Sequence, residues 1–353
     1  MRAANHHFGQ MSEQTDSVKR KAATSYDVAR AAGVAQSTVS RCFSGDSLIS
    51  PETRQRVLSA AAELGYTPNT LARSLITQRS NTVALAITGY TMRDSPNVMY
   101  TLADALAKQS MRVMLITAES DEDLRPAIVD LFGFPLDGLI TCASMHADDS
   151  RQFLRRGVAM VAYNRKIDVP KVDAVLADHD GASRLMAKRL LQAGHKKMLC
   201  VAGPREAPVS RERIEGFISS AREAGAEVPH VLHTDFSYGD CKDKFLSYAA
   251  GVKSLPQAIF CANDELAFAI MDACRYDLRL RVPEDVSIVG FDDVAVAERP
   301  TYRLSTARPP ADEMANKAVE LLLRRIREPD ARARTVRFDC DLIERDSARF
   351  GNH

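Results

Sequence analysis

From residue 81 onward, short apolar runs alternate with longer stretches of helical periodicity. Each run is rich in aliphatic and β-branched residues, which is typical of a strand buried on both faces. Because helix-length segments separate the runs, we predict parallel sheets covered by helices on both faces. Two successive series predict two lobes with a ligand cleft at the strand ends. The runs are 83–87, 112–116, 138–140 and 159–162, and then 174–176, 198–201, 258–260 and 286–289.

Residues 24–66 show a different pattern, which predicts three short helices. Thr24 or the following serine can cap the first helix, and Gly33 supplies the positive φ that ends it. The third helix opens with Ser50 and Pro51, an N-cap followed by proline at the first helical position. The sequence therefore predicts a small helical domain ahead of the α/β region.

A further short helix can follow Asn69, but it is too short to be stable alone in water and needs a surface to fold against. With this segment as a linker, the pattern predicts five regions. These are a disordered tail at 1–23, a helical domain at 24–67, a hinge and linker at 68–80, a two-lobe domain at 81–345 and a C-terminal tail at 346–353.

Composition supports a globular chain with more than one domain, since 353 residues are 45% hydrophobic and 26% charged. Lys and Arg number 47 against 46 Asp and Glu, a formal net charge of +1, so nucleic-acid binding requires a local basic patch. Residues 19–79 contain nine Lys and Arg but only four Asp and Glu. Charge alone fits a solvated arginine-rich surface as well as a DNA-binding one.

The seven cysteines are scattered, with no C-x-x-C pair and no histidines at metal-ligand spacing. We therefore predict reduced thiols, no metal and no cofactor. No run has the length of a transmembrane span, and the N-terminus lacks the pattern of an export signal. These features predict a cytoplasmic protein without membrane association.

Residues 26–41 fit a helix-turn-helix, in which a glycine-containing turn lets the second helix lie in a DNA major groove. We expect polar side chains of the second helix to face outward, where Gln can pair with adenine, Arg with guanine and Ser with either. Thr24 and Thr38 can anchor phosphates near helix starts. The outward residues are Gln36, Ser37, Ser40 and Arg41.

The strings YDVARAAGV, STVSR, SPETRQRVLSAAAELGY and PN followed by ARSL resemble the DNA-binding head of the lac repressor and galactose repressor family. The resemblance implies that Tyr26 contacts the operator, that Gln36 and Ser37 select its sequence, and that Arg41 reads a guanine. It also implies a hinge helix with Asn69 and Ala72, whose Leu75 wedges into the minor groove when two subunits pair on bent DNA.

From residue 81 to about 345, the strings GHKKM, RIEGF, CAND and SIVGFDD resemble the effector domain of the same family, which has the fold of periplasmic sugar-binding proteins. The resemblance implies that Arg213 clamps a small-molecule effector and that Asp292 accepts from it. It also implies that Asn164 and Asn263 line the cleft and that Phe236 stacks on the ligand. Without the resemblance, each of these residues has an ordinary structural role as a surface charge, turn, cap or core residue.

Three departures from the family pattern bear on the sites. Ala35 stands where the family commonly has Ser to cap the recognition helix, which costs on the order of 1 kcal/mol locally. Asp178 and His179 replace the usual Asp-Asn pair, and the first-lobe loop reads SPNVMY where the family usually has an Asn-Pro-aromatic run. The resemblance is therefore weaker in the first-lobe half of the ligand site. For His179 we expect a cap or surface role.

Together these features predict a transcriptional repressor that binds pseudo-palindromic double-stranded operator DNA as a homodimer. A sugar, sugar acid or related metabolite in the cleft would shift it between two states. One alternative is a solute-binding protein of the same fold without a regulatory role. Another is an enzyme using Asp292 and Asp293 as paired carboxylates, but no nucleophile motif, phosphate-binding glycine loop or metal set accompanies them. We predict that the chain is not an enzyme.

Overall fold

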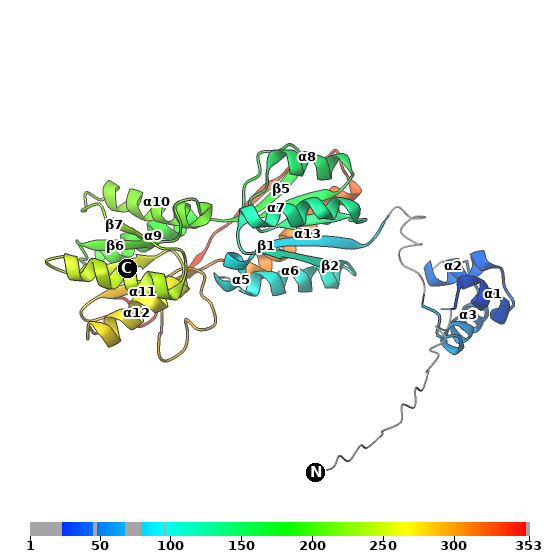
Figure 1. Cartoon of the computed structure of the whole chain (residues 1–353), viewed down its shortest axis with the longest axis horizontal. Coiled ribbons are helices and arrows are strands. Elements are labelled where there is room, and N and C mark those ends of the chain that lie inside the picture. Colours follow the sequence, from blue (N-terminus) through cyan, green and yellow to red (C-terminus); the bar gives the residue numbers. More distant parts are fainter. Residues whose placement is uncertain (1–22, 45–47, 68–78, 95, 351–353) are drawn as a thin grey trace, which may run out of the picture. The chain divides into compact units, whose positions relative to one another are not determined.

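The computed structural model describes residues 23–44, 48–67, 79–94 and 96–350. The chain divides into two compact units, Met1–Ile76 and Thr77–His353, which we call the head and the body. Figure 1 shows both units and labels many of their helices and strands. No helix within the described ranges is long and apolar enough to cross a membrane.

Three helices form the described part of the head, and local caps define where they start and stop. Thr24 caps the first helix in a reciprocal capping box with Asp27. Gly33 ends it with a φ of 63°, in the left-handed region that favours glycine. Ser50 caps the third helix and Pro51 takes its first position, as predicted. The helices are α1 (Ser25–Ala32), α2 (Gln36–Ser44) and α3 (Pro51–Glu63).

A small apolar core holds the head together. One valine from each helix is fully buried: Val28 on α1, Val39 on α2 and Val57 on α3. Each such burial stabilises the fold by about 1.5–3 kcal/mol. The rings of Phe43 and Tyr66 pack beside this core with their centroids 5.8 Å apart. The core thereby fixes the angle between α1 and α2.

The first lobe of the body contains a six-stranded sheet in which every strand pairs in parallel, in the order β11-β5-β4-β3-β1-β2. Its strands are β1 (Thr82–Thr88), β2 (Arg112–Ala118), β3 (Gly138–Thr141), β4 (Ala159–Tyr163), β5 (Val172–Ala177) and β11 (Thr335–Phe338). Its helical segments are α5 (Gly89–Asp94), α6 (Pro96–Lys108), α7 (Asp121–Asp130), η1 (Leu131–Gly133), α8 (Ala147–Arg155) and α13 (Ala311–Arg327).

Helices cover both faces of this sheet, as β1 illustrates. Val83, Leu85 and Ile87 belong to one core with residues of α6 and α13. Ala84 and Ala86 point the other way, into a core with residues of α7 and α8. In Figure 1, α7 and α8 lie above the sheet and α6 below it. The apolar run 83–87 is therefore a strand buried on both faces, as parallel sheets require.

The second lobe contains a four-stranded parallel sheet in the order β7-β6-β8-β9. Its strands are β6 (Met198–Ala202), β7 (His230–His233), β8 (Ala258–Cys261) and β9 (Ser287–Val289). Its helical segments are α9 (His179–Gln192), α10 (Pro208–Glu223), α11 (Tyr238–Gly251), α12 (Asp264–Asp272) and η2 (Ala273–Asp277). A separate antiparallel pair joins β10 (Thr306–Arg308) to β12 (Asp341–Ile343).

The assignment of 174–176 to the second series of strands was wrong, because β5 pairs with β4 in the first sheet. No helix lies between β4 and β5, so the alternation of strands and helices gave no sign of the lobe boundary. The sheet is completed by β11, which returns from the C-terminal region and pairs with β5. The chain therefore passes between the lobes three times: after β5, before α13 and after β11.

Residues 346–350, predicted as part of a C-terminal tail, pack onto the second lobe. Ser347 is fully buried, and its hydroxyl donates to the carbonyl of Ile288 at 2.6 Å. The same hydroxyl oxygen accepts from the amide of Ser305 at 2.8 Å. Ala348 is buried beside it, and Phe350 packs against the core. The fold thus continues past residue 345.

Candidate functional site

The outer face of α2 in the head carries polar side chains at helical spacing. Ser37, Ser40 and Arg41 are exposed, and their spacing of three and four residues places them on one face of the helix. Val39 and Cys42 are buried on the opposite side. This face presents two hydroxyls and a guanidinium, which are groups that read base edges in a major groove.

Two further predicted residues of α2 are less exposed than expected. Gln36, predicted to face outward, is half-buried, and its Nε2 donates to Ser25 Oγ at 3.2 Å. This contact ties the start of α2 to the start of α1, so the amide of Gln36 has a structural partner as well as a surface edge. Thr38 is also half-buried.

The other predicted DNA contacts lie at the start of α1 and in the hinge. Tyr26 is 69% exposed in the first turn of α1. The Thr24 hydroxyl donates to Asp27 Oδ2 at 2.7 Å as part of its cap. The hinge residues Asn69, Ala72 and Leu75 lie outside the described residues.

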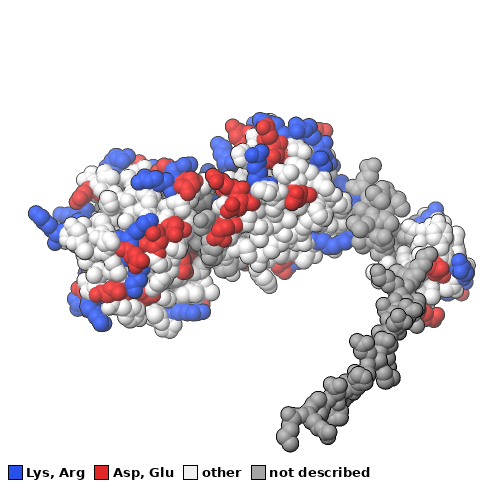
Figure 2. All heavy atoms as spheres, in the orientation of Figure 1, with Lys and Arg blue, Asp and Glu red and all other residues white. Residues whose placement is uncertain are grey.

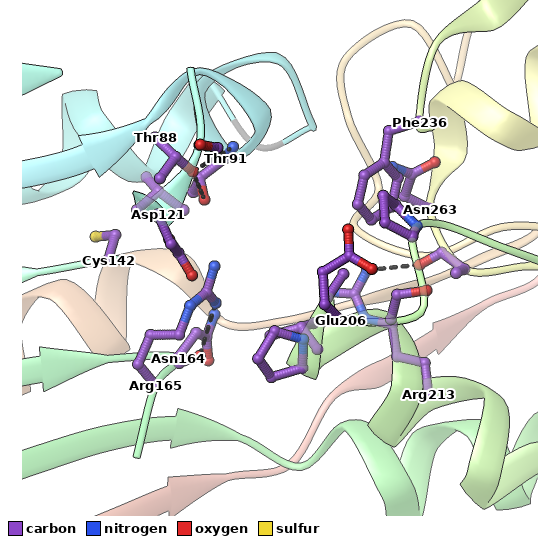
Figure 3. A pocket seen from close by; sticks show the side chains of 18 of the residues that line it. Thr88, Thr91, Asp121, Cys142, Asn164, Arg165, Glu206, Arg213, Phe236 and Asn263 are labelled. Carbon is purple, nitrogen blue, oxygen red and sulfur yellow. Dashed lines mark hydrogen bonds between the residues drawn. The ribbon is translucent and has the colours of Figure 1, made fainter. Parts of the chain in front are cut away.

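A cavity of about 390 Å³ lies between the two lobes of the body, at the carboxyl ends of the parallel strands. The five residues predicted to hold an effector all line it: Asn164, Arg213, Phe236, Asn263 and Asp292. Four of them follow strands β4, β7, β8 and β9, and Arg213 comes from α10. Figure 3 shows residues of both lobes reaching into the same space.

Arg213 is the most constrained side chain in this cavity. It is 6% exposed, and its Nη1 and Nη2 donate to Asp292 Oδ2 and Oδ1 at 3.0 and 2.6 Å. Nη1 also donates to the carbonyl of Ala262 at 2.7 Å. The guanidinium lies over the ring of Phe291, 3.8 Å from its centroid. The arginine and the aspartate therefore form a buried bidentate ion pair in a fixed orientation.

His179 completes the surroundings of Arg213, and its predicted cap or surface role was wrong. It is 2% exposed, and its Nδ1 accepts from Arg213 Nε at 3.3 Å. Its ring packs against Phe291 with centroids 5.4 Å apart. Burial, and then the charge of Arg213, lower the pKa of His179 well below its ordinary value. The imidazole is therefore neutral and offers a lone pair to the arginine.

Asn263 serves as both a helix cap and a cavity residue. Its Oδ1 accepts from the amide of Leu266 at 2.9 Å, which caps α12. The side chain is 1% exposed, and its Nδ2 has no hydrogen-bond partner among the described residues. A buried amide donor without a partner costs about 1–3 kcal/mol, so this group favours an acceptor from a ligand.

Phe236 and Asp292 both adopt backbone conformations with positive φ, of 69° and 110°. The ring of Phe236 packs on the backbone of Gly203, where an added Cβ would lie 2.1 Å from its Cζ. Glycine at this position therefore leaves the space that the ring fills. Strained backbone of this kind costs of order 1–3 kcal/mol and is often found at binding sites.

The first-lobe side of the cavity contains residues that the sequence reasoning missed. Asn164 is held by a hydrogen bond from the amide of Ala177 to its Oδ1 at 2.9 Å, and its carbonyl accepts from Arg165 Nη1 at 2.9 Å. Thr88 ends β1, Cys142 directly follows β3 and Arg165 lies two residues after β4, and this position at a strand end is a signal that could have found them. The missed lining residues of the first lobe include Thr88, Thr91, Ser120, Asp121, Glu122, Cys142 and Arg165, and Glu206 was missed in the second lobe.

Asp292 and Asp293 do not form a pair of catalytic carboxylates. Asp292 accepts from Arg213, whereas Asp293 accepts from Arg308 at 2.5 Å and from Arg345 at 2.7 Å. The adjacent side chains therefore go to different partners, and each carboxylate is neutralised by its own cations. No group of three or more metal-ligating side chains is placed to hold an ion in the part of the chain that the structure describes.

Comparisons with known proteins match both units. The model of the bacterial regulatory proteins of the lacI family matches residues 24–69, and that of a periplasmic binding protein-like domain matches residues 187–348. The HTH-type transcriptional regulator CelR of Thermobifida fusca is 32% identical over 326 residues, covering 87% of this chain and 93% of that protein. The ribose operon repressor of Escherichia coli K12 is 29% identical and covers 92% of this chain and 100% of the repressor.

Solved structures show the same fold. The lac repressor dimer bound to operator and the anti-inducer ONPF matches with a TM-score of 0.82 and 23% identity, covering 93% of this chain and 99% of that one. A CelR–cellobiose complex matches with a TM-score of 0.67 and 30% identity, covering 92% and 99%. The fold is a helix-turn-helix head joined to a two-lobe body of the periplasmic-binding-protein type, as the sequence predicted.

Proposed function

The chain belongs to the lacI family of bacterial regulatory proteins, and we propose from this membership that it is a transcriptional repressor whose operator affinity is set by a small molecule. It binds pseudo-palindromic double-stranded DNA as a homodimer through the head. The effector occupies the cavity between the lobes of the body. The observation that carries the proposal is that one chain joins a helix-turn-helix with a polar outer face to a cleft lined by all five predicted effector residues.

In the head, we propose that Ser37, Ser40 and Arg41 contact base edges and that Gln36 contributes the free edge of its amide. Tyr26 contacts the operator from α1, and Thr24 and Thr38 approach the phosphate backbone. Asn69, Ala72 and Leu75 form the hinge that inserts into the minor groove when two subunits pair. DNA binding is the role of region 24–67, the hinge is region 68–80, and effector control is the role of region 81–345.

In the body, a ligand in the cavity touches both lobes, so it changes the balance between open and closed arrangements. The chain crosses between the lobes three times, and these crossings are where the motion would be absorbed. The relatives include a ribose operon repressor and a regulator solved with cellobiose, which supports a sugar or related metabolite as effector. We place the protein's action in the cytoplasm, where a bacterial operator lies.

Two other functions are less well supported. A solute-binding protein of the same fold would not need the polar-faced head, which matches the lacI family model. The relatives are transcriptional regulators rather than enzymes, and we extend this to the chain as a whole by proposing that it has no catalytic activity.

The proposal is tested by selecting fragments of a whole bacterial genome with the purified full-length protein at low ionic strength, with and without a metabolite library. We expect enrichment of a two-fold symmetric site. The metabolite that changes this enrichment should also raise the Tm of the protein. The Arg41→Ala protein, in which the head core is untouched, is the control and should enrich the site less strongly, because it loses about 1–3 kcal/mol of specific binding. If wild type preferred no sequence under any condition, the repressor function would be rejected.

A further inference from the structure

The two guanidinium groups of the cavity, on Arg165 and Arg213, each lie near a carboxylate, which restricts the ligands that the cavity can hold. Four of the five N–H groups of Arg213 are engaged, because Nε donates to His179, Nη1 donates to Asp292 and to the Ala262 carbonyl, and Nη2 donates to Asp292. The two side chains of this pair are each 7% exposed. An anionic ligand would have to compete with a buried carboxylate for the same guanidinium, and charges of like sign in a buried site repel strongly.

The second guanidinium of the cavity, on Arg165, forms no ion pair with a described residue but lies near Asp121. Asp121 is a source of electrostatic attraction for it, and Figure 3 shows the two side chains reaching toward each other from the first lobe. One terminal nitrogen of Arg165 donates to the carbonyl of Asn164 at 2.9 Å. Its Nε is buried and has no hydrogen-bond partner in the described ranges. This nitrogen can donate to a ligand oxygen.

The rim of the cavity adds negative charge from both lobes. Glu122 of α7 and Glu206 of the second lobe are exposed, and neither forms an ion pair with another described residue. In Figure 2, acidic side chains gather at the edge of the first lobe that faces the second lobe. The residues lining the cavity carry four carboxylates, on Asp121, Glu122, Glu206 and Asp292, against two guanidinium groups. A cavity with this excess attracts cations and repels anions.

The hydrogen-bonding groups of the cavity specify the ligand further. Asn263 Nδ2 and Arg165 Nε are buried donors that need acceptors. The carboxylates are acceptors that need donors. A hydroxyl group can accept from the first set and donate to the second, whereas an ionised carboxylate or phosphate can only accept. The cavity is therefore matched to a ligand with several hydroxyls.

We infer that the cleft is selective for a polyhydroxylated ligand without negative charge, and that it favours an amine-bearing sugar over the corresponding sugar acid or sugar phosphate. This inference rests on the proposed effector role of the cleft. It narrows that role to neutral and amino sugars and excludes the sugar acids that the sequence alone left open.

The test uses matched probes on the full-length protein. Glucose, galactose, mannose and ribose are each compared with their amino, carboxylate and phosphate derivatives, together with cellobiose, first by thermal shift and then by calorimetric titration. Within any set that binds, we expect the neutral or amino form to bind at least about tenfold more tightly than the anionic forms. A carboxylate or phosphate derivative that bound as tightly as its neutral parent would overturn the inference while leaving the effector role intact. If no probe and no library metabolite bound, the effector role itself would be rejected, and the inference with it.

A variant of the cavity rim tests whether its carboxylates cause the selectivity against anions. The double change Glu122→Gln and Glu206→Gln should reduce the ratio of Kd values between anionic and neutral probes by about threefold for each charge removed. The effect is modest because these charges act through solvent-exposed space. Glu227→Gln is the matched control, since Glu227 is exposed and lies outside the cavity. An unchanged difference in the double variant would show that the rim charges do not set the selectivity, and would count against the inference.

Discussion

Replacing Arg213 by methionine tests the buried ion pair on which the cleft depends. The change keeps an apolar stem against the ring of Phe291 but removes the charge that neutralises Asp292 and the donor to the Ala262 carbonyl. Breaking a buried pair by removing one partner costs about 3–5 kcal/mol. Asp292 borders the cavity, so water can reach part of the carboxylate, and we expect the lower end, about 3 kcal/mol. For a unit of this size that corresponds to a fall of about 6–12 °C in Tm.

The assay is a double-mutant cycle measured by calorimetric unfolding of Arg213→Met, Asp292→Asn and the double variant. Because the double variant leaves no uncompensated buried charge, it should lose less stability than the sum of the singles, by at least about 1 kcal/mol. Below its own Tm, the Arg213→Met protein should still bind operator but not respond to effector. The reasoning is refuted if the single variants lose stability additively or if Arg213→Met unfolds at the wild-type temperature.

Three further predictions concern other parts of the molecule. Gly203→Ala should displace the Phe236 ring, since the added Cβ would lie 2.1 Å from its Cζ. The variant should bind effector more weakly, as measured by calorimetric titration, and should bind operator as wild type does. His179 is held neutral in the folded protein, whereas an unfolded histidine gains a proton near pH 6.5, so wild type should lose stability as pH falls below that value, by at most about 1.4 kcal/mol per pH unit. The free energy of unfolding, measured by urea denaturation from pH 7 to pH 5, should depend less steeply on pH in His179→Asn than in wild type. The exposed His230→Asn variant should show the wild-type dependence. An equal dependence on pH in all three proteins would contradict a buried, neutral His179. Arg41→Ala should cost about 1–3 kcal/mol of specific operator binding and leave weaker, salt-sensitive binding, which fluorescence anisotropy at increasing salt would reveal; uniform weakening on all sequences would argue for a phosphate contact instead.

The head was predicted in most of its detail because its signals are local. A cap such as Thr24 acts on an amide three residues away, and Gly33 ends α1 through its own φ. The exposed face of α2 follows from helical spacing alone. Gln36 was the exception, since its partner Ser25 belongs to the neighbouring helix and is 11 residues away.

The cleft was predicted through its resemblance to a family, which identified five lining residues but not their partners. No local pattern shows that Arg213 is already paired, because Asp292 is 79 residues away and His179 is 34 residues away. The acidic rim was missed for the same reason, since Glu122 and Glu206 belong to different lobes.

By itself, the sequence determined the helices of the head, most of the buried strands and the positions where polar residues follow strand ends. These features depend on side-chain periodicity and on residues within one or two turns of each other. The tertiary structure alone decided that β5 and β11 join the first sheet, that His179 is buried against an arginine, and that the cavity carries excess negative charge. Each of these arises when segments far apart in the chain meet, and the energy of such a contact depends on burial and on partners that no local pattern contains.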